Sequence, residues 1–340
     1  MATLKAIHID SINIGLIVVS LILAYWLPFE LFLFSYAVLG PLHYATEINW
    51  LHGKYFFSEN RSQKLILVIV ATLVSLPFIL KMPFINTLAE WPVLNLLVAF
   101  VKKHTGELLL ISFLIGVGSI VRMSRNSQWI FLFFALAITY SLSSTFGKTG
   151  LWVALFLPTL IHVYVFTLLF MLYGAFKSQS KVGVWAFAFA LAVPFFIAWV
   201  PIPLHEYPIS TLTKTAFDAS GMSNVSQYLA KWYLGFSGEN FPLLSLLGLK
   251  IQVFIAFCYT YHYLNWFSKT TLIGWHKNLN SKRSVTIALV WGCSVGLYIY
   301  DYAIGLSALF FLSLLHVLLE FPLNALTIKA LFKKMIYNEV

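Results

Sequence analysis

Long apolar runs recur from one end of the chain to the other, separated by short polar segments. A membrane-spanning helix needs about 20 mostly apolar residues, and these runs match that length. They predict about ten spans, at residues 11–28, 29–52, 65–83, 106–121, 128–146, 150–175, 183–201, 245–268, 284–301 and 304–328. The pattern therefore predicts an all-α fold, a polytopic transmembrane helical bundle that forms one integral-membrane domain over residues 1–340.

Three segments need separate treatment. The stretch 86–101 is short and flanked by loop residues, which favours an interfacial or re-entrant segment. Residues 202–240 contain several prolines and predict an external loop, in which the amphipathic piece "SQYLAKWYLGF" (226–236) is expected to lie as a helix on the membrane face. The N-terminal run is not followed by a small-residue cleavage site, so it predicts a retained first span and not a cleaved signal peptide.

The charged residues support this topology. Only 10% of the residues are charged and 60% are hydrophobic, whereas soluble domains carry about 25% charged residues. The net charge of +10 comes from Lys and Arg gathered in alternate short loops, which is the positive-inside pattern. With ten spans, both the N- and C-termini are cytoplasmic, and we expect a multi-pass protein of a bacterial inner membrane. No basic–aromatic pattern indicates a nucleic-acid partner.

Four of the nine histidines lie inside apolar runs, each in a different predicted span. They are His43, His162, His262 and His316. Under the ten-span topology these four spans run in the same direction, and the four imidazoles fall at similar depths toward the cytoplasm. Imidazole is a good ligand for iron, zinc and copper, so the set predicts a metal site. Taken singly, a histidine in a membrane helix is more often a hydrogen-bonding contact between helices than a metal ligand.

Two glutamates accompany these histidines at helical spacing. Glu47 follows His43 by four residues, and Glu320 follows His316 by four residues, so each acid lies one turn from its histidine. A metal-binding histidine usually donates its other ring nitrogen to a carboxylate or carbonyl group. Glu47 and Glu320 are therefore the candidate catalytic carboxylates, either orienting a histidine or binding the metal directly. A structural ion pair is the competing explanation, but basic residues are nearly absent from the spans.

The order of the motifs resembles that of a known enzyme family. Four segments carry the resemblance: "GPLHYATE" (40–47), "LIHVYVF" (160–166), "FCYTYHYLNWF" (257–267) and "LLHVLLEFP" (314–322). Similar segments occur in this order in the bacterial Brp/Blh family of membrane β-carotene 15,15'-dioxygenases. The resemblance covers these four short motifs, spread over most of the chain. The family carries aspartate where this chain has Glu47 and Glu320, and a second histidine near the position of Trp266.

The resemblance implies a function. His43, His162, His262 and His316 would bind a non-haem Fe(II) ion that reacts with O2. The substrate would be an apolar polyene or lipid taken directly from the bilayer, such as a carotenoid or another isoprenoid, which the enzyme would oxidise to carbonyl products. The protein would supply the dry, shaped pocket.

Other functions are compatible with intramembrane histidines. A di-iron desaturase is disfavoured, because its HxxxH and HxxHH boxes are absent from the sequence. A bis-histidine haem protein is a second alternative, and a haem spectrum would identify it. The main non-enzymatic alternative is a membrane transporter for a metal ion or a proton-coupled solute, which would use the intramembrane His and Glu residues. A structural or lipid-binding membrane protein without a metal is the fourth.

Overall fold

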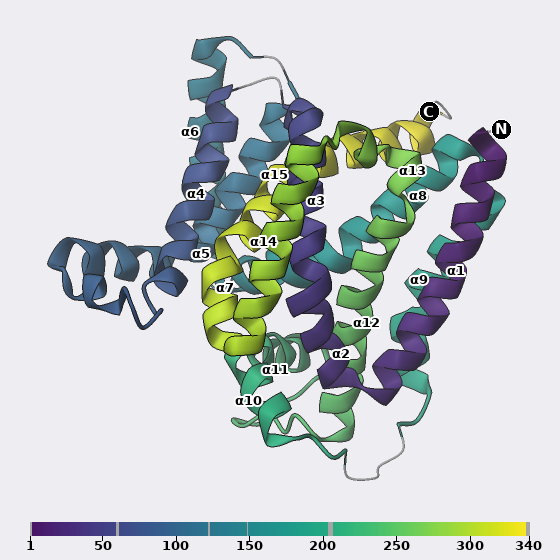
Figure 1. The fold of residues 1–340 in the computed structure, drawn as a ribbon. Coiled ribbons are helices and arrows are strands. Elements are labelled where there is room, and N and C mark those ends of the chain that lie inside the picture. The colour runs from purple at the N-terminus through teal and green to yellow at the C-terminus, as the bar shows by residue number, and fades with distance from the viewer. Residues whose placement is uncertain (1, 59–60, 122, 148, 203–206, 338–340) are drawn as a thin grey trace. The chain divides into compact units, whose positions relative to one another are not determined.

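The computed structural model describes residues 2–58, 61–121, 123–147, 149–202 and 207–337 (Figure 1). Within these residues every regular element is helical, so the all-α prediction is confirmed. Seven helical segments in the described part are long and apolar enough to cross a membrane: Lys5–Trp26, Arg61–Ile79, Asn126–Thr145, Gly150–Ser178, Lys181–Trp199, Ser281–Tyr300 and Tyr302–Ile336. They are consistent with an integral membrane protein.

Three of the ten predicted spans are helical but do not belong to these seven. They fall in α3 (Gly40–Gly53), α5 (Pro92–Ser119) and α12 (Leu246–Ser268). Helix α3 is short, α5 carries Lys102, Lys103 and Glu107, and α12 contains several polar side chains. The count of ten therefore stays a prediction.

The chain divides into two compact units, of which the first comprises residues 1–43, 163–276 and 288–303. Its helices are α1 (Ala2–Trp26), α2 (Pro28–Phe34), η1 (Ser35–Leu39), α8 (Thr167–Ser178), α9 (Lys181–Trp199), α10 (Thr211–Ala219), α11 (Met222–Tyr233), α12, α13 (Thr270–Ile273) and most of α14 (Ser281–Tyr300). Helix α12 is the core of this unit, because it packs against α1, α2, α9 and α11. Its polar side chains are thus covered by protein.

The second unit comprises residues 44–162, 277–287 and 304–340. It contains most of α3, together with η2 (Tyr55–Phe57), α4 (Arg61–Ile79), η3 (Asn86–Glu90), α5, α6 (Arg125–Thr145), α7 (Thr149–Phe156) and most of α15 (Tyr302–Tyr337). Helix α5 packs against α4, α6 and α7. A Cβ atom added at Gly106 would lie 1.8 Å from the Gly150 carbonyl oxygen, so α5 and α7 approach closely where neither has a side chain.

The segment predicted to be interfacial forms a continuation of α5. The structure joins residues 92–104 to the rest of α5 through a kink at His104, whose φ and ψ are −112° and 18°. In Figure 1, the blue segment formed by η3 and the beginning of α5 projects sideways from α4. Its large apolar side chains are exposed, including Trp91 (62%), Val93 (78%) and Leu96 (73%). Such a surface is typical of a segment that rests in the membrane interface.

Two π-helical stretches were not predicted. The first, η1, leads directly into α3, and the second, η4 (Leu157–Phe166), connects α7 to α8. Pro158 lies in η4, and Thr159 next to it departs from helical geometry with φ −112° and ψ −105°. A π-turn holds one extra residue and rotates the side chains that follow, and such turns are frequent at functional sites.

The predicted external segment 202–240 contains two short helices. Helix α11 (Met222–Tyr233) covers most of the predicted amphipathic piece 226–236, and α10 (Thr211–Ala219) precedes it. Residues 203–206 of this segment lie outside the described residues. The predicted helix is confirmed, and its position on a membrane face stays a prediction.

Candidate metal centre

The first unit brings two of the predicted histidines together. His43 lies in the first turn of α3 and His262 lies in α12, and both rings are buried, with 1% and 7% of their surface exposed. Their Nε2 atoms are 3.0 Å apart, and the ring planes are nearly perpendicular at 76°. The Nε2 atoms of the two imidazoles therefore face each other.

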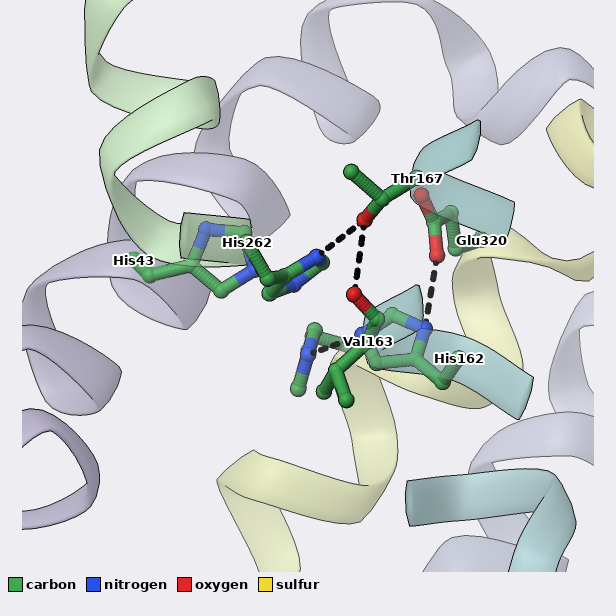
Figure 2. A network of polar contacts seen from close by, with 7 residues as sticks. His43, His162, Val163, Thr167, His262 and Glu320 are labelled. Carbon is green, nitrogen blue, oxygen red and sulfur yellow. Dashed lines mark hydrogen bonds and ion pairs between the residues drawn. The ribbon is translucent and has the colours of Figure 1, made fainter. Parts of the chain in front are cut away.

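A threonine fixes the protonation state of His262 (Figure 2). The Oγ1 atom of Thr167, at the start of α8, lies 2.7 Å from Nδ1 of His262 and donates to the Val163 carbonyl oxygen at 3.0 Å. A threonine hydroxyl has a single proton, and here the Val163 carbonyl accepts it. Nδ1 of His262 must then be the donor to Thr167, which leaves the Nε2 lone pair of His262 available to a metal ion.

The second unit contains the other pair. His162 in η4 and His316 in α15 are buried, and their Nε2 atoms are 3.1 Å apart. Nδ1 of His162 lies 3.0 Å from a carboxylate oxygen of Glu320, as Figure 2 shows. This ion-pair contact places a carboxylate beside Nδ1 and so favours the tautomer of His162 that carries its proton on Nδ1, with the Nε2 lone pair directed toward His316. Glu320 thus orients a histidine of another helix and not its own helical neighbour, His316.

Glu47 completes the polar cluster of the second unit. Its side chain is 1% exposed, and a carboxylate oxygen lies within 4.8 Å of a ring nitrogen of His316. Its carboxyl group also interacts with that of Glu320. Along α3, Glu47 lies one turn beyond His43. This position allows Glu47 either to bind a metal directly or to orient a ligand.

The spacing of the ring nitrogens fits metal binding. Two imidazole nitrogens about 2.1 Å from one ion lie about 3.0 Å apart when they occupy adjacent octahedral corners, and about 3.4 Å apart at tetrahedral corners. The observed separations of 3.0 and 3.1 Å match adjacent octahedral corners. A direct hydrogen bond between two imidazoles has the same length, so distance alone does not choose between the two. The tautomer favoured at His162 and His262, with the proton on Nδ1, is the one that a metal bound at Nε2 requires.

The structure therefore pairs all four predicted histidines, two in each unit, and places Glu320 as the partner of His162. Sequence reasoning missed Thr167 as the partner of His262. Thr167 follows His162 by five residues, which does not suggest a shared function in a regular α-helix. In a π-helical stretch such as η4, five residues come close to one full turn.

An apolar groove in the first unit is separate from the histidines. It has a volume of about 580 Å³ and lies between α1 and α9, where its lining includes Leu21, Tyr25, Phe189 and Phe196. None of the four histidines lines it. The groove is therefore not the place where the metal chemistry would occur.

A scan against protein-family models, a search of curated proteins and a search of solved structures found no match to this chain.

Proposed function

We propose that this protein is a membrane-embedded non-haem iron oxygenase that oxidises a carotenoid or another apolar isoprenoid or lipid. The proposal assigns His43, His162, His262 and His316 as the ligands of one Fe(II) ion. The observation that carries it is the arrangement of the two buried pairs. In each pair one histidine has its Nδ1 beside an oxygen atom of Thr167 or Glu320, which favours the tautomer whose Nε2 lone pair can bind metal.

Chain continuity supports the assignment of both pairs to one ion. His43 and Glu47 lie on α3, which is one unbroken helix. His162 and Thr167 lie on the continuous helical run from η4 into α8. On α3, His43 of the first pair is about one turn from Glu47, which neighbours His316 of the second pair. On the run from η4 into α8, His162 of the second pair is about one turn from Thr167, the partner of His262. The motif order that resembles the Brp/Blh family gives independent support.

The protein's own groups would have four tasks in such an enzyme. Bound Fe(II) supplies the activation of O2, which an organic side chain cannot provide. Thr167 and Glu320 hold His262 and His162 in the tautomer that binds metal, and the buried rings of all four histidines exclude water from the centre. Four neutral imidazoles leave the ion at charge +2 with open positions for O2 and an apolar substrate. Glu47 would orient one ligand or bind the ion.

Metal analysis of the detergent-purified protein, with an absorption spectrum of the same sample, tests the proposal. We expect one iron per chain, no Soret band, and loss of the iron in His162→Ala and in His262→Ala. His276→Ala is the matched control, because His276 is exposed, and it should retain the iron. A protein that binds iron as expected is then incubated with carotenoids and O2, and aldehyde products are analysed. A Soret band, zinc in place of iron, or no metal under any loading condition would contradict the proposal.

One observation favours a second candidate, a transporter. Glu47, Glu320 and His162 form a buried acid–histidine cluster in the second unit, and such clusters line proton and ion pathways in membranes. This alternative expects proton or metal flux into liposomes that contain the purified protein. It also expects loss of the flux in Glu47→Gln, without any oxidation of a carotenoid.

A further inference from the structure

A row of tyrosines leads away from the His43–His262 pair. All its members belong to the first unit, and each ring contacts the next: Tyr263, Tyr259, Tyr36, Tyr298 and Tyr302. The ring centroids are 6.2, 5.8, 6.4 and 4.9 Å apart in this order. At the inner end, the Tyr263 ring lies 5.1 Å from the His43 ring and 5.4 Å from the His262 ring. We call these five residues the tyrosine row.

The outer end of the row reaches the edge of the unit. Tyr298 lies near the end of α14 and Tyr302 is the first residue of α15. Asp301 stands between the two helices and is exposed. The row therefore connects the buried histidine pair to a turn at the surface of the first unit, through residues from η1, α12 and α14.

Packing alone does not explain why these five residues are tyrosines. The chain has 31 phenylalanines but only 17 tyrosines, and a phenylalanine would pack equally well without a hydroxyl to satisfy. A hydroxyl without a partner is costly to bury. The Tyr302 hydroxyl is buried and has no hydrogen-bond partner among the described residues. Phe32 also contacts Tyr36 and Tyr259, but the tyrosines by themselves form a continuous path of ring contacts. This path suggests that their redox chemistry is used, because phenol is far easier to oxidise than benzene.

We propose that the tyrosine row carries oxidising equivalents from the metal centre to the membrane edge. This proposal rests on the proposed oxygenase function. If Fe(II) bound at the centre reduced O2 without substrate, the O2-derived oxidant would take one electron and one proton from Tyr263. The Tyr263 radical takes one electron and one proton from Tyr259, and the same exchange repeats along the row. The Tyr302 side chain is partly exposed although its hydroxyl is buried, and the last radical, at Tyr302, takes one electron and one proton from a hydroquinone of the bilayer.

The net reaction moves one hydrogen atom from the hydroquinone to the O2-derived oxidant, and every tyrosine returns to its phenol form. Transfer by successive short steps is fast, because electron tunnelling weakens steeply with distance and the rings of the row are in contact. The row would protect His43 and His262 from oxidation during reactions that fail to reach a substrate.

Photochemistry on metal-free protein tests the row independently of iron. Cys293 is an exposed free thiol in the part of α14 that belongs to the first unit, whereas Cys258 is buried. A ruthenium photo-oxidant is attached at Cys293, and 3-aminotyrosine, which is easier to oxidise than tyrosine, replaces Tyr263 as a radical trap. After a laser flash with a sacrificial electron acceptor, we expect the aminotyrosyl radical to form at position 263.

Variants that interrupt the row identify the path. We expect Tyr36→Phe and Tyr259→Phe each to slow formation of the radical at position 263 by more than an order of magnitude. Tyr261→Phe is the matched control, because Tyr261 is equally buried on α12 but contacts Phe257 and lies outside the row. It should leave the rate unchanged. Circular dichroism confirms that each variant is folded.

The outcomes separate this proposal from the proposed function. Equal rates in the parent protein and Tyr36→Phe, or no radical at position 263, would overturn the tyrosine row even if the protein binds iron. Row-dependent transfer in a protein that binds no iron would support conduction along the row and contradict only the oxygenase. In iron-loaded protein exposed to O2 without substrate, Tyr36→Phe should also show faster oxidation of histidine, measured by mass spectrometry.

Discussion

Replacement of Thr167 by valine tests whether His262 is prepared to bind a metal. Valine has nearly the same shape as threonine but cannot accept the hydrogen bond from Nδ1 of His262, which is 2.7 Å long in the structure. In the variant, metal-bound His262 must leave a buried Nδ1–H without a partner. Metal-free His262 can escape this penalty by moving its proton to Nε2, so the loss falls mainly on the metal-bound state.

The size of the effect follows from these contacts. Leaving one buried donor unsatisfied costs about 1–3 kcal/mol, and loss of a partner of a metal-binding histidine typically weakens metal affinity about 10–100-fold. These two ranges agree, since a tenfold change in affinity corresponds to about 1.4 kcal/mol. We measure binding of Co²⁺, whose visible absorption reports coordination, to metal-free protein in detergent. Thr167→Val should bind Co²⁺ about 10–100-fold more weakly than the parent protein.

Two further variants make the result specific. Thr167→Ser keeps the hydroxyl and should restore most of the affinity. Thr260→Val is the matched control, because Thr260 is as buried as Thr167 and loses a comparable hydrogen bond to Ser35, 2.7 Å long. It should lower stability without changing Co²⁺ affinity. Equal affinities for Thr167→Val and the parent protein would show that Nδ1 of His262 does not need this partner, and the tautomer argument would be wrong.

Three other changes have defined outcomes. Glu320→Gln removes the charge that faces Nδ1 of His162 and should weaken Co²⁺ binding about tenfold, in the same titration. Gly116→Ala places a Cβ atom 2.4 Å from Cβ of Phe321, so thermal unfolding in detergent should show a loss of about 1–3 kcal/mol. Burial lowers the pKa of Lys269 from 10.5 to about 8, against the opposing effect of a nearby aspartate. The unfolded chain therefore binds the Lys269 proton more tightly than the folded protein does, so the free energy of unfolding should rise between pH 8 and pH 10.5. This rise should be smaller in Lys269→Met, which has no proton to lose at that position.

Each of these three predictions has a matched control variant. Glu107→Gln changes a carboxylate that accepts a hydrogen bond from Ser143 and is far along the sequence from the four proposed ligands, and it should leave Co²⁺ affinity unchanged. Gly174→Ala adds a Cβ atom with nothing within 4 Å, so it should not lower stability. Lys177→Met replaces an exposed lysine, and the dependence of its stability on pH should equal that of the parent protein. A change in any of these controls as large as in its partner variant would contradict the corresponding argument.

The apolar runs were enough to predict the helices, because a segment surrounded by lipid must satisfy its backbone groups internally. They did not predict where helices join or bend. The pattern separates the stretches 86–101 and 106–121, whereas α5 begins at Pro92, within the first stretch, and continues into the second with a kink at His104. The π-helical stretches η1 and η4 were also missed, because they depend on the packing of neighbouring helices, which an apolar pattern does not contain.

The four histidines and two glutamates could be found because polar residues in apolar runs are few. Which histidine pairs with which could not, since residues distant in sequence meet only through the tertiary fold. His43 pairs with His262 across 219 positions, and His162 pairs with His316 across 154 positions. Helical spacing suggested His316 as the neighbour of Glu320, but the carboxylate contacts His162. Thr167 stands where the Brp/Blh family usually has an acid, but it was not predicted as the partner of His262, because buried threonines are common in membrane helices.

The number of spans decides on which side of the membrane the two ends of the chain lie. Ten spans put both ends on the same side, whereas the seven segments that meet a strict hydropathy requirement would put them on opposite sides. We expect ten, because a helix covered by protein does not need apolar side chains on every face. In α12, 15 of 23 residues are buried, and the polar ones among them include Gln252 and Asn265. Epitope tags at the two ends, probed with antibody before and after the cytoplasmic face is made accessible, should both react only afterwards. Reaction of one tag before that treatment would mean an odd number of spans, and α3, α5 and α12 could not all cross the membrane.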